Sequence, residues 1–314
     1  MKTLLDAVRY FSDPQVCIDT VAAMRWKDGE PTCPKCNSKN VLWLKNQLRW
    51  KCRAKGCTKQ FSVKVGTIFE DSPIPLDKWL VGMWLIGNCK NGISSYEIAR
   101  DLGITQKSAW FMLHRIRVAM KDKPTHLTIG GTRGTVEVDE TFIGGKAANM
   151  HKDRQPQVAK GQKTIVMGML DRKTRQIRAK VIPNVKRGTL QAEILKNVGF
   201  NSHVYTDQHV GYDGLNNLKD FTHKTVNHMT EYVNGKVHTQ GIENFWACLK
   251  RTLAGTYVAV EPFHMDAYVD EQVFRFNTSK THSEEKRFAK VLSQVAGRRL
   301  TYAELTGKVG EIPF

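Results

Sequence analysis

The spacing of hydrophobic residues changes twice along the chain, and each change predicts a different kind of structure. Residues 37–51 alternate apolar and polar positions, which is typical of two short strands. Residues 76–89 form a mostly apolar segment of helical length, with an acid near its start and a glycine just past its end. From about residue 130 the pattern becomes strand-like again, so we expect a domain boundary near residue 125.

A turn at Gly103 separates two further helices that the apolar spacing predicts between residues 94 and 120. Serines before the first helix and Thr105 before the second are suited to cap them. This is helix-turn-helix spacing, in which the second helix can enter the DNA major groove and present polar side chains to base edges. An ordinary helical hairpin is the alternative interpretation. The side chains available to read DNA are Gln106, Lys107, Ser108 and Arg115.

The strand-like part of the chain has a definite order of elements. Three strands, a helix, a strand, a short helix, a strand and a helix are predicted over residues 135–143, 163–170, 176–183, 187–198, 203–207, 211–217, 224–228 and 239–253. This is the order of the RNase H-like fold. We therefore expect an α/β domain with a mixed sheet flanked by helices.

Four of the seven cysteines form two close pairs, Cys33 with Cys36 and Cys52 with Cys57. The strand-like segment of residues 37–51 separates the pairs, so a hairpin would bring all four sulfur atoms toward one point. Four thiolates in this arrangement suit one tetrahedral Zn²⁺ ion, and the segment is predicted to be a zinc ribbon. Buried or disulfide-bonded thiols are the alternative, and a reducing cytoplasm disfavours the second of these.

Composition adds a partner and a compartment to this picture. The 314 residues suffice for two or three domains and carry a net charge of +18. An excess of this size is typical of a protein with a polyanionic partner, nucleic acid first, although it does not separate DNA from RNA. No apolar run is long enough for a membrane span. The first residues carry Asp6 and Arg9 within an apolar run and make a poor secretory signal, so we expect a cytoplasmic protein without a membrane partner.

Acidic residues occur at three points of the strand-like part. Asp139 lies in its first strand, Asp207 at the end of its fourth, and Glu243 on the helix after its last strand. Three carboxylates from three elements are what a two-metal phosphoryl-transfer site needs, with Mg²⁺ or Mn²⁺ as the ions. Two acids compete with Asp139: Glu137 would share its face of the strand, and Glu140 would point the other way.

These residues stand in stretches that resemble the DDE transposases of bacterial insertion sequences, in the subgroup with an N-terminal zinc ribbon and an ISXO-like catalytic domain. The resemblance covers roughly residues 10–280, and the stretches that match include "RWKDGEPTCPKCNS", "SYEIARDLGITQKSAWFMLHRIRVAM", "VEVDETFIGGK", "YTDQHVGYDGL" and "HTQGIENFWACLKRTLAGTY", whose combination is more specific than any one of them. It implies that Asp139, Asp207 and Glu243 are the catalytic acids and that they hold two Mg²⁺ or Mn²⁺ ions.

The third acid is the least constrained of the three. Lys250, seven residues after Glu243, matches the basic residue of the family pattern and favours Glu243. Asn244 and Gln240 remain alternatives, because some members of the group use asparagine at this point. Trp246, close by on the same predicted helix, is expected to be a core residue, with stacking on a displaced base as its alternative role.

The resemblance also implies how such a protein would work. The zinc ribbon and the helix-turn-helix would bind the terminal inverted repeats of an insertion sequence. The catalytic domain would hydrolyse a phosphodiester at the element end, and the freed 3′-OH would attack target DNA. Double-stranded DNA is then the partner, and joining two ends requires a homodimer or a larger assembly. The basic residues expected to contact DNA phosphates are Lys146, Lys250 and Arg251.

Two other functions are compatible with these patterns: a sequence-specific DNA-binding regulator with an inactive nuclease-like domain, and a structure-selective nuclease. Under every interpretation we expect an α/β catalytic domain with an RNase H-like mixed sheet, preceded by a zinc ribbon and a helix-turn-helix domain. The expected boundaries are 1–66 for an N-terminal helix and the zinc ribbon, 67–124 for the helix-turn-helix, 125–280 for the catalytic domain and 281–314 for a C-terminal tail without an assigned role.

Overall fold

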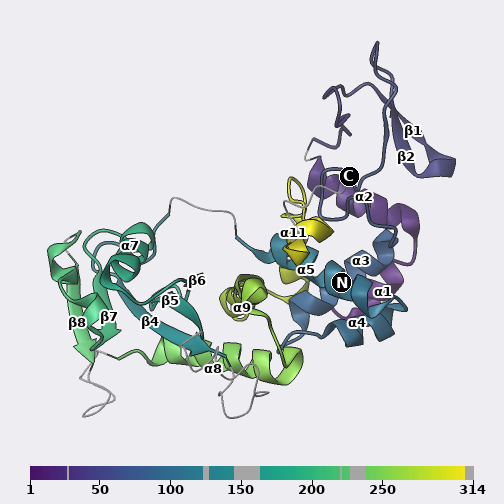
Figure 1. Cartoon of the computed structure of the whole chain (residues 1–314). Coiled ribbons are helices and arrows are strands. Elements are labelled where there is room, and N and C mark those ends of the chain that lie inside the picture. The colour runs from purple at the N-terminus through teal and green to yellow at the C-terminus, as the bar shows by residue number, and fades with distance from the viewer. Residues whose placement is uncertain (27, 123–126, 145–162, 220, 227–237, 308–314) are drawn as a thin grey trace. The chain divides into compact units, whose positions relative to one another are not determined.

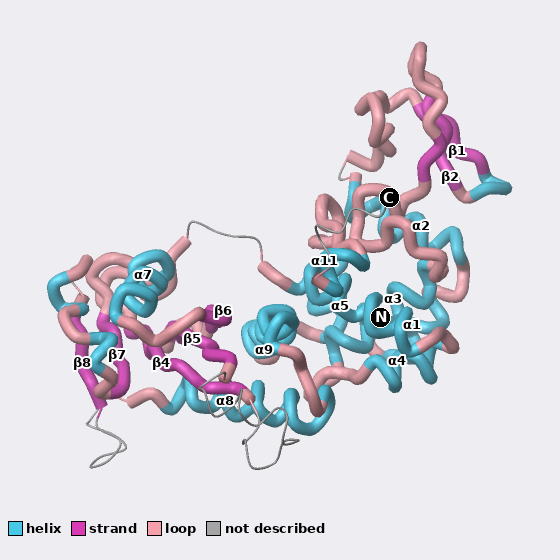
Figure 2. Tube along the Cα trace, in the orientation of Figure 1, coloured by secondary structure: helices cyan, strands magenta, loops and turns pink. Residues whose placement is uncertain are grey.

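The computed structural model describes residues 1–26, 28–122, 127–144, 163–219, 221–226 and 238–307. The chain divides into two compact units. One unit combines Met1–Asp122 with Thr281–Phe314, and the other is Lys123–Lys280. Figure 1 shows the elements of each unit, and Figure 2 distinguishes helices from strands along the same trace.

The first unit is mostly helical and contains one small sheet. Its elements are α1 (Leu4–Tyr10), α2 (Pro14–Arg25), β1 (Val41–Leu44), β2 (Arg49–Cys52), β3 (Gln60–Phe61), α3 (Leu76–Asn88), α4 (Ser95–Leu102), α5 (Gln106–Met120), α10 (Glu284–Leu292) and α11 (Tyr302–Thr306). The central helix is α3, which is buried along most of its length and packs against α1, α2, α5 and α10. Phe288 of α10 contacts the rings of Phe11 and Trp84. The C-terminal segment therefore completes a core that begins at the N-terminus.

The small sheet is antiparallel, in the order β1-β2-β3. The two strands expected within residues 37–51 are confirmed as β1 and β2, which a short 3₁₀ turn joins. The ring of Trp50 packs against Trp26, Trp43 and Phe61. Four aromatic rings are a small core, so this module needs support from something other than apolar burial.

Two helices form on either side of Gly103, as the sequence predicts. Ser94 caps α4, and Thr105 caps α5 by accepting a hydrogen bond from the Ser108 N–H. Gly103 has a φ of +58°, in the left-handed region that favours glycine. Most residues of α5 from Met112 onward are buried, so the exposed surface of α5 lies mainly on its first two turns.

The second unit contains a five-stranded mixed sheet in the order β6-β5-β4-β7-β8. Its strands are β4 (Thr135–Ile143), β5 (Thr164–Asp171), β6 (Ile177–Ile182), β7 (His203–Asp207) and β8 (Thr222–Val226). The first three are antiparallel, whereas β7 pairs in parallel with β4 and with β8. Its helices are α7 (Arg187–Asn197), α8 (Gln240–Thr252) and α9 (Met265–Thr278).

The predicted strands and long helices of this unit are observed with small shifts of their ends, and one element differs. The helix expected over residues 211–217 is wrong: two 3₁₀ turns, Val210–Tyr212 and Leu215–Asn217, stand in its place. Gly214 lies between them with a φ of +81°, which a continuous right-handed helix does not accommodate. After Thr252 the chain continues from α8 into a short π-helical turn, Leu253–Tyr257.

Each face of the sheet has its own hydrophobic core. Val136 and Val138 of β4 pack with residues of α7 in one core. The other core contains Val166, Leu170 and Ile177 of the sheet together with residues of α8 and α9. Since side chains alternate along a strand, Glu137 and Asp139 face α8. Glu140, the next residue along β4, therefore lies on the opposite face of the sheet from Glu137 and Asp139.

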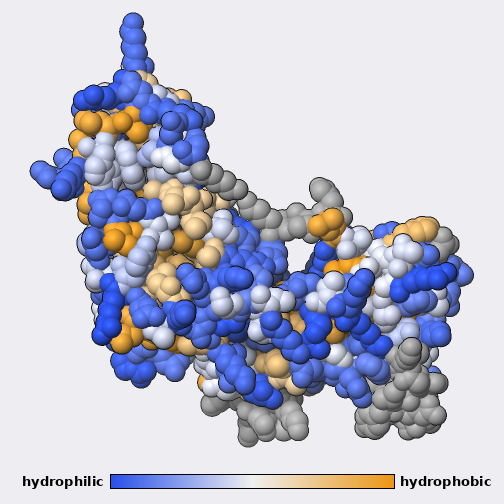
Figure 3. All heavy atoms as spheres, turned by 180° about the vertical axis from the view of Figure 1, so that it is seen from behind, coloured by the Kyte–Doolittle hydropathy of each residue, from blue (hydrophilic) through white to orange (hydrophobic). Residues whose placement is uncertain are grey.

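Hydrophilic residues cover most of the face that Figure 3 shows for each unit, and apolar residues appear there in small patches. Among the helices that the structure describes, none combines the length and the apolar character that crossing a bilayer requires.

Candidate metal and catalytic centres

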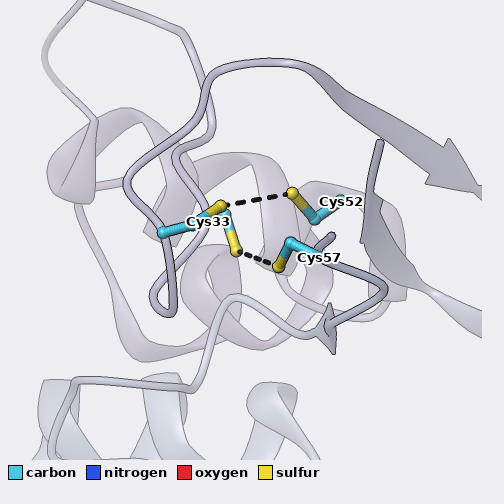
Figure 4. A group of neighbouring side chains, drawn as sticks. Cys33, Cys52 and Cys57 are labelled. Carbon is cyan, nitrogen blue, oxygen red and sulfur yellow. Dashed lines mark hydrogen bonds between the residues drawn. The ribbon is translucent and has the colours of Figure 1, made fainter. Parts of the chain in front are cut away.

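Four sulfur atoms meet at one point in the ribbon. The Sγ atoms of Cys33 and Cys57 are 3.8 Å apart, those of Cys36 and Cys52 are 3.5 Å apart, and all four lie within 4.8 Å of one another. Thiolates at ~2.3 Å from a tetrahedral zinc ion stand about 3.8 Å from each other, whereas a disulfide holds two sulfur atoms at about 2.05 Å. Figure 4 shows the sulfur atoms of the labelled cysteines turned toward one another. The cluster fits a structural Zn²⁺ ion.

Two tight turns build this cluster. In the first, the Cys33 N–H donates to the Ser38 carbonyl and the Asn37 N–H donates back to Cys33. In the second, the Cys57 N–H donates to the Ala54 carbonyl, and Gly56 takes a φ of +76°. Burial raises the pKa of the Cys33 thiol, but hydrogen bonds from neighbouring backbone N–H groups outweigh it and bring that pKa to about 7. Backbone hydrogen bonds lower the pKa values of the Cys36 and Cys52 thiols, but burial and the neighbouring cysteines of the cluster outweigh them and raise both. Cys33 therefore ionises more readily than these two, and a bound cation would favour their thiolate forms.

Asp139 and Asp207 stand level on neighbouring strands. The parallel pairing of β4 with β7 aligns Thr135 with His203 and Glu137 with Tyr205. Continued two residues past these pairs, the same register brings Asp139 level with Asp207. Both residues are only half-buried, at the end of β7 where the sheet opens. Two carboxylates thus lie on neighbouring strands, just past the last paired residues of β4 and β7, and the charge of Asp207 acts on Asp139.

The carboxyl group of Asp139 is in an environment that favours its neutral form. Its pKa is raised to about 7, mainly by burial and to a smaller extent by the nearby charges of Glu140 and Asp207, against the lowering effect of a hydrogen bond from Trp246. A divalent cation would reverse this balance, because it supplies the positive charge that stabilises two adjacent carboxylates. The chemistry of the donor set therefore fits a hard, oxygen-binding cation such as Mg²⁺.

Trp246 links α8 to this position. Its indole Nε1 donates to Asp139 Oδ2 at 2.9 Å, and its side chain is 5% exposed. Gly168, the β5 partner of Asp139, makes room for the ring: a Cβ atom there would lie 2.8 Å from Trp246 Cη2. The expectation that Trp246 is a core residue is confirmed, but its contact with Asp139 was not foreseen. The glycine inside an otherwise apolar strand was the available signal.

Glu243 lies on the first turn of α8, where it is exposed. Its Oε1 accepts a hydrogen bond from the hydroxyl of Thr239 at 3.0 Å. Within the described residues, the four cysteines are the one group of three or more metal-type ligands gathered around a point. The structure therefore brings Asp139 and Asp207 together, and it does not draw the Glu243 carboxylate into the same cluster.

The two competing acids have separate environments. Glu137 is 1% exposed, and its carboxylate accepts from Arg172 Nε at 2.6 Å and from the Ile242 N–H at 2.9 Å. Glu140 faces the other side of the sheet, where it binds the hydroxyl of Tyr212. Neither arrangement was apparent from the sequence beyond the alternation of faces, because Arg172 and Tyr212 are distant along the chain.

The residues expected to contact DNA differ in their location and exposure. Gln106 and Lys107 lie on the first turn of α5, with Ser108 beside them in contact with Thr105. Lys250 and Arg251 are exposed on α8, and Lys146 falls outside the described residues. Arg115 differs: it is 4% exposed and donates to the carbonyl groups of Leu300 and Glu70 at 3.0 and 2.7 Å. Its guanidinium holds α5 against the rest of its unit, which leaves it no open path to a base.

Comparisons with known proteins agree with this arrangement. Residues 132–277 match the family described as the ISXO2-like transposase domain, and residues 12–60 match the transposase zinc-ribbon domain. An uncharacterized protein in the transposable element ISH50 of Halobacterium salinarum is 26% identical over 265 residues, covering 79% of this chain and 85% of that protein. An uncharacterized transposase-like protein of Haemophilus influenzae is 36% identical over 104 residues, covering 33% of this chain and 83% of that protein.

Proposed function

Because the chain belongs to the family of ISXO2-like transposases, we propose that it binds the ends of an insertion sequence and catalyses metal-dependent hydrolysis and strand transfer of DNA there. The observation that carries the proposal is the parallel register of β4 and β7, which, continued by two residues, brings Asp139 level with Asp207 near the helix that bears Glu243. Two level carboxylates and a third on a nearby helix are the ligands that two-metal phosphoryl transfer uses.

Asp139, Asp207 and Glu243 would hold two Mg²⁺ or Mn²⁺ ions. Bound there, the ions would activate the attacking oxygen and stabilise the leaving one. The chain itself would contribute fixed geometry, because Asp139 and Asp207 both lie on strands of one sheet, directly after the paired part of β4 and β7. The indole of Trp246 orients one oxygen of Asp139 and leaves the other for a metal. An RNase H-like fold is consistent with the order β6-β5-β4-β7-β8, three antiparallel strands followed by two parallel ones.

The phase of α8 favours Glu243 as the third ligand. Trp246, which contacts Asp139, marks the side of the helix that faces the carboxylates. At ~100° per residue, Glu243 lies about 60° from Trp246 around the helix axis, whereas Asn244 lies about 160° and Gln240 about 120° away. A change of the Glu243 rotamer is sufficient to turn its carboxylate toward this side, but Asn244 points to the opposite one.

DNA binding would involve both units. Lys107 is exposed on the first turn of α5, so α4 and α5 would act as the helix-turn-helix that reads the inverted repeat. Lys250 and Arg251 on α8 would contact phosphates near the cleavage site. Arg115 is not included in this set, because its guanidinium is committed to backbone carbonyl groups. Joining two element ends requires two active sites, so we expect a homodimer or larger assembly on DNA.

The test is a cleavage and joining assay with purified protein, Mg²⁺ and a labelled duplex of the element end. The wild type is expected to nick this duplex at the element boundary and to join the 3′ end to a target, while Asp139→Asn loses at least ~10³-fold of the rate. Glu193→Gln, which removes an acid of α7 paired with Lys180, is the matched control and should behave as the wild type. Equal activity of Asp139→Asn and wild type would refute the catalytic role.

The same assay separates the two rival functions. A DNA-binding regulator would bind the end duplex without nicking it at any Mg²⁺ concentration. A structure-selective nuclease would cut hybrids or branched DNA of unrelated sequence as fast as the element end. The proposed transposase requires that both cutting and joining depend on the end sequence.

A further inference from the structure

We infer that Glu137 and Arg172 form an anchor that fixes the first turn of α8 against the sheet and thereby sets the position of Glu243. This inference rests on the proposed function and assigns a role to two residues that hold no metal themselves. We call the pair the α8 anchor. Glu137 and Arg172 act through α8, so both are positioning residues.

Glu137 caps α8 from a different element. The N–H groups of the first turn of a helix have no partner within that helix and need another acceptor. The side chain of Thr239, the N-cap residue, does not cap the backbone N–H groups of this turn. Glu137 Oε2 accepts from the Ile242 N–H at 2.9 Å instead, across the interface between β4 and α8. A carboxylate at this end of a helix also interacts favourably with the helix dipole.

This arrangement leaves Thr239 available for another contact. Its hydroxyl donates to Glu243 Oε1 at 3.0 Å, and the residue is only 2% exposed. The cap and the catalytic acid are therefore connected: Glu137 holds the backbone of the first turn, and Thr239 holds the carboxylate that this turn carries. Loss of the first contact would allow the turn to fray, and the backbone position from which Glu243 can turn its carboxylate toward Asp139 would be lost with it.

Arg172 ties the anchor to the strands that carry the two aspartates. Its Nε donates to Glu137 Oε1 at 2.6 Å, and its guanidinium also donates to the carbonyl of His238, one residue before the N-cap. Its own N–H donates to the Thr135 carbonyl of β4 at 3.0 Å. The guanidinium lies 4.9 Å from the ring centre of Tyr205 on β7. One side chain thus contacts β4, β7 and the entry to α8, the three elements that bear the acids.

Gly241 permits the close approach on which the anchor depends. A Cβ atom at this position would lie 2.5 Å from Leu170 Cδ2 and 2.9 Å from Glu137 Oε2. Contacts this short force a shift, either of the side-chain ends of Leu170 and Glu137 or of the first turn of α8, and either shift disturbs the contact between Glu137 and this turn. Elsewhere on an exposed first turn, alanine would favour the helix over glycine. The glycine is therefore explained by the contact with Glu137 and Leu170.

The chain contains a second buried pair that lacks this connection. Glu271 is 0% exposed and binds Arg275 and Tyr257 within the second unit, at the other end of α8. Both pairs are buried Glu–Arg pairs, and breaking either one leaves an uncompensated charge. Only the α8 anchor touches the turn that carries Glu243. Glu271→Gln is therefore the control for loss of stability alone.

The first experiment compares Glu137→Gln with Glu271→Gln in the full-length, zinc-loaded protein. Mn²⁺ binding is titrated by electron paramagnetic resonance without DNA, and amide hydrogen exchange is followed over residues 240–243. For Glu137→Gln we expect Mn²⁺ affinity to fall ~10–100-fold, as for other residues that orient metal ligands, with faster exchange in the first turn of α8. Glu271→Gln should lower the melting temperature and leave Mn²⁺ affinity unchanged.

A second variant keeps the carboxylate and moves the helix. Gly241→Ala should reproduce the loss of Mn²⁺ affinity with Glu137 intact, and it carries the test if Glu137→Gln does not fold. Adding Mn²⁺ in excess should restore end cleavage by both variants in part, which a general loss of folded protein would not allow. Unchanged Mn²⁺ affinity in Glu137→Gln or Gly241→Ala, in a wild type that binds Mn²⁺, would overturn the inference. A wild type that binds no Mn²⁺ would instead refute the proposed function.

Discussion

The cysteines of the ribbon and the acids of the second unit are both sets of side chains that can bind metal ions. They differ in how much apolar core surrounds them. In the ribbon, few apolar residues are available and the four sulfur atoms already lie together. In the second unit, two apolar cores hold the sheet and its helices in place, and the acids stand at the edge. We therefore expect the ribbon to need its metal in order to fold. The second unit is expected to fold without metal, and burial of the charged Asp139 carboxylate should lower its stability.

Removing zinc is therefore expected to cause the largest loss of stability, and this loss should be confined to the ribbon. Structural zinc contributes about 10–16 kcal/mol of apparent binding free energy in small zinc modules. Cys52→Ser, or treatment with a strong chelator, should abolish amide protection in β1 and β2 while protection in β4 and β5 persists. Hydrogen exchange with mass spectrometry measures both regions in one sample. Cys248→Ser, at a cysteine remote from the cluster in sequence, is the control and should leave the ribbon protected.

Neutralising Asp139 is expected to stabilise the second unit, whereas removing zinc destabilises the ribbon. The pKa of this carboxyl is raised to about 7 by burial, above its ordinary value of 3.8. Its contribution to stability is therefore complete below pH 4 and is lost as the pH rises through 7. Three pKa units correspond to about 4 kcal/mol as an upper limit. In buffer without Mg²⁺, Asp139→Asn should be more stable than the wild type at pH 8.

Urea unfolding of the second unit at pH 4 and pH 8 measures this difference. The gain should shrink toward zero at the lower pH, where the wild-type carboxyl is already protonated. Added Mg²⁺ should stabilise the wild type and have no effect on Asp139→Asn. If Asp139→Asn were less stable than the wild type at pH 8, the ionised Asp139 carboxylate would not be destabilising the folded state.

More of the ribbon than of the acidic site could be predicted from the sequence, because local patterns are visible in a sequence and long-range contacts are not. Cysteine spacing and strand alternation are local patterns, so the ribbon and the strands of the sheet were predicted closely. The contact between Trp246 and Asp139 joins residues more than a hundred positions apart. Likewise, the burial of Arg115 depends on the Leu300 carbonyl, which no local pattern connects to α5. The helix expected at 211–217 failed because Gly214 takes a positive φ.

Trp246→Phe tests the side-chain hydrogen bond to Asp139. The ring would remain packed against Gly168, but the hydrogen bond to the carboxylate would be lost. Hydrogen bonds to charged groups contribute about 1.5–3 kcal/mol, so a loss of about 2 kcal/mol is expected at pH 8. In the Asp139→Asn background the same change should cost about 1 kcal/mol, because the acceptor is then neutral. A double-mutant cycle by urea unfolding gives this coupling, and equal costs in both backgrounds would contradict it.

Asn244 should give the smallest effect, and that makes it informative. It is exposed and lies beside Glu243, but on the opposite side of α8 from Trp246. Exposed substitutions away from such contacts usually change stability by less than about 0.5 kcal/mol. Asn244→Ala should therefore leave both unfolding and end cleavage close to wild type, while Glu243→Gln loses cleavage with little change in unfolding. If Asn244→Ala instead abolished Mn²⁺-dependent cleavage, the third ligand would be the asparagine, and the phase of α8 inferred from Trp246 would be wrong.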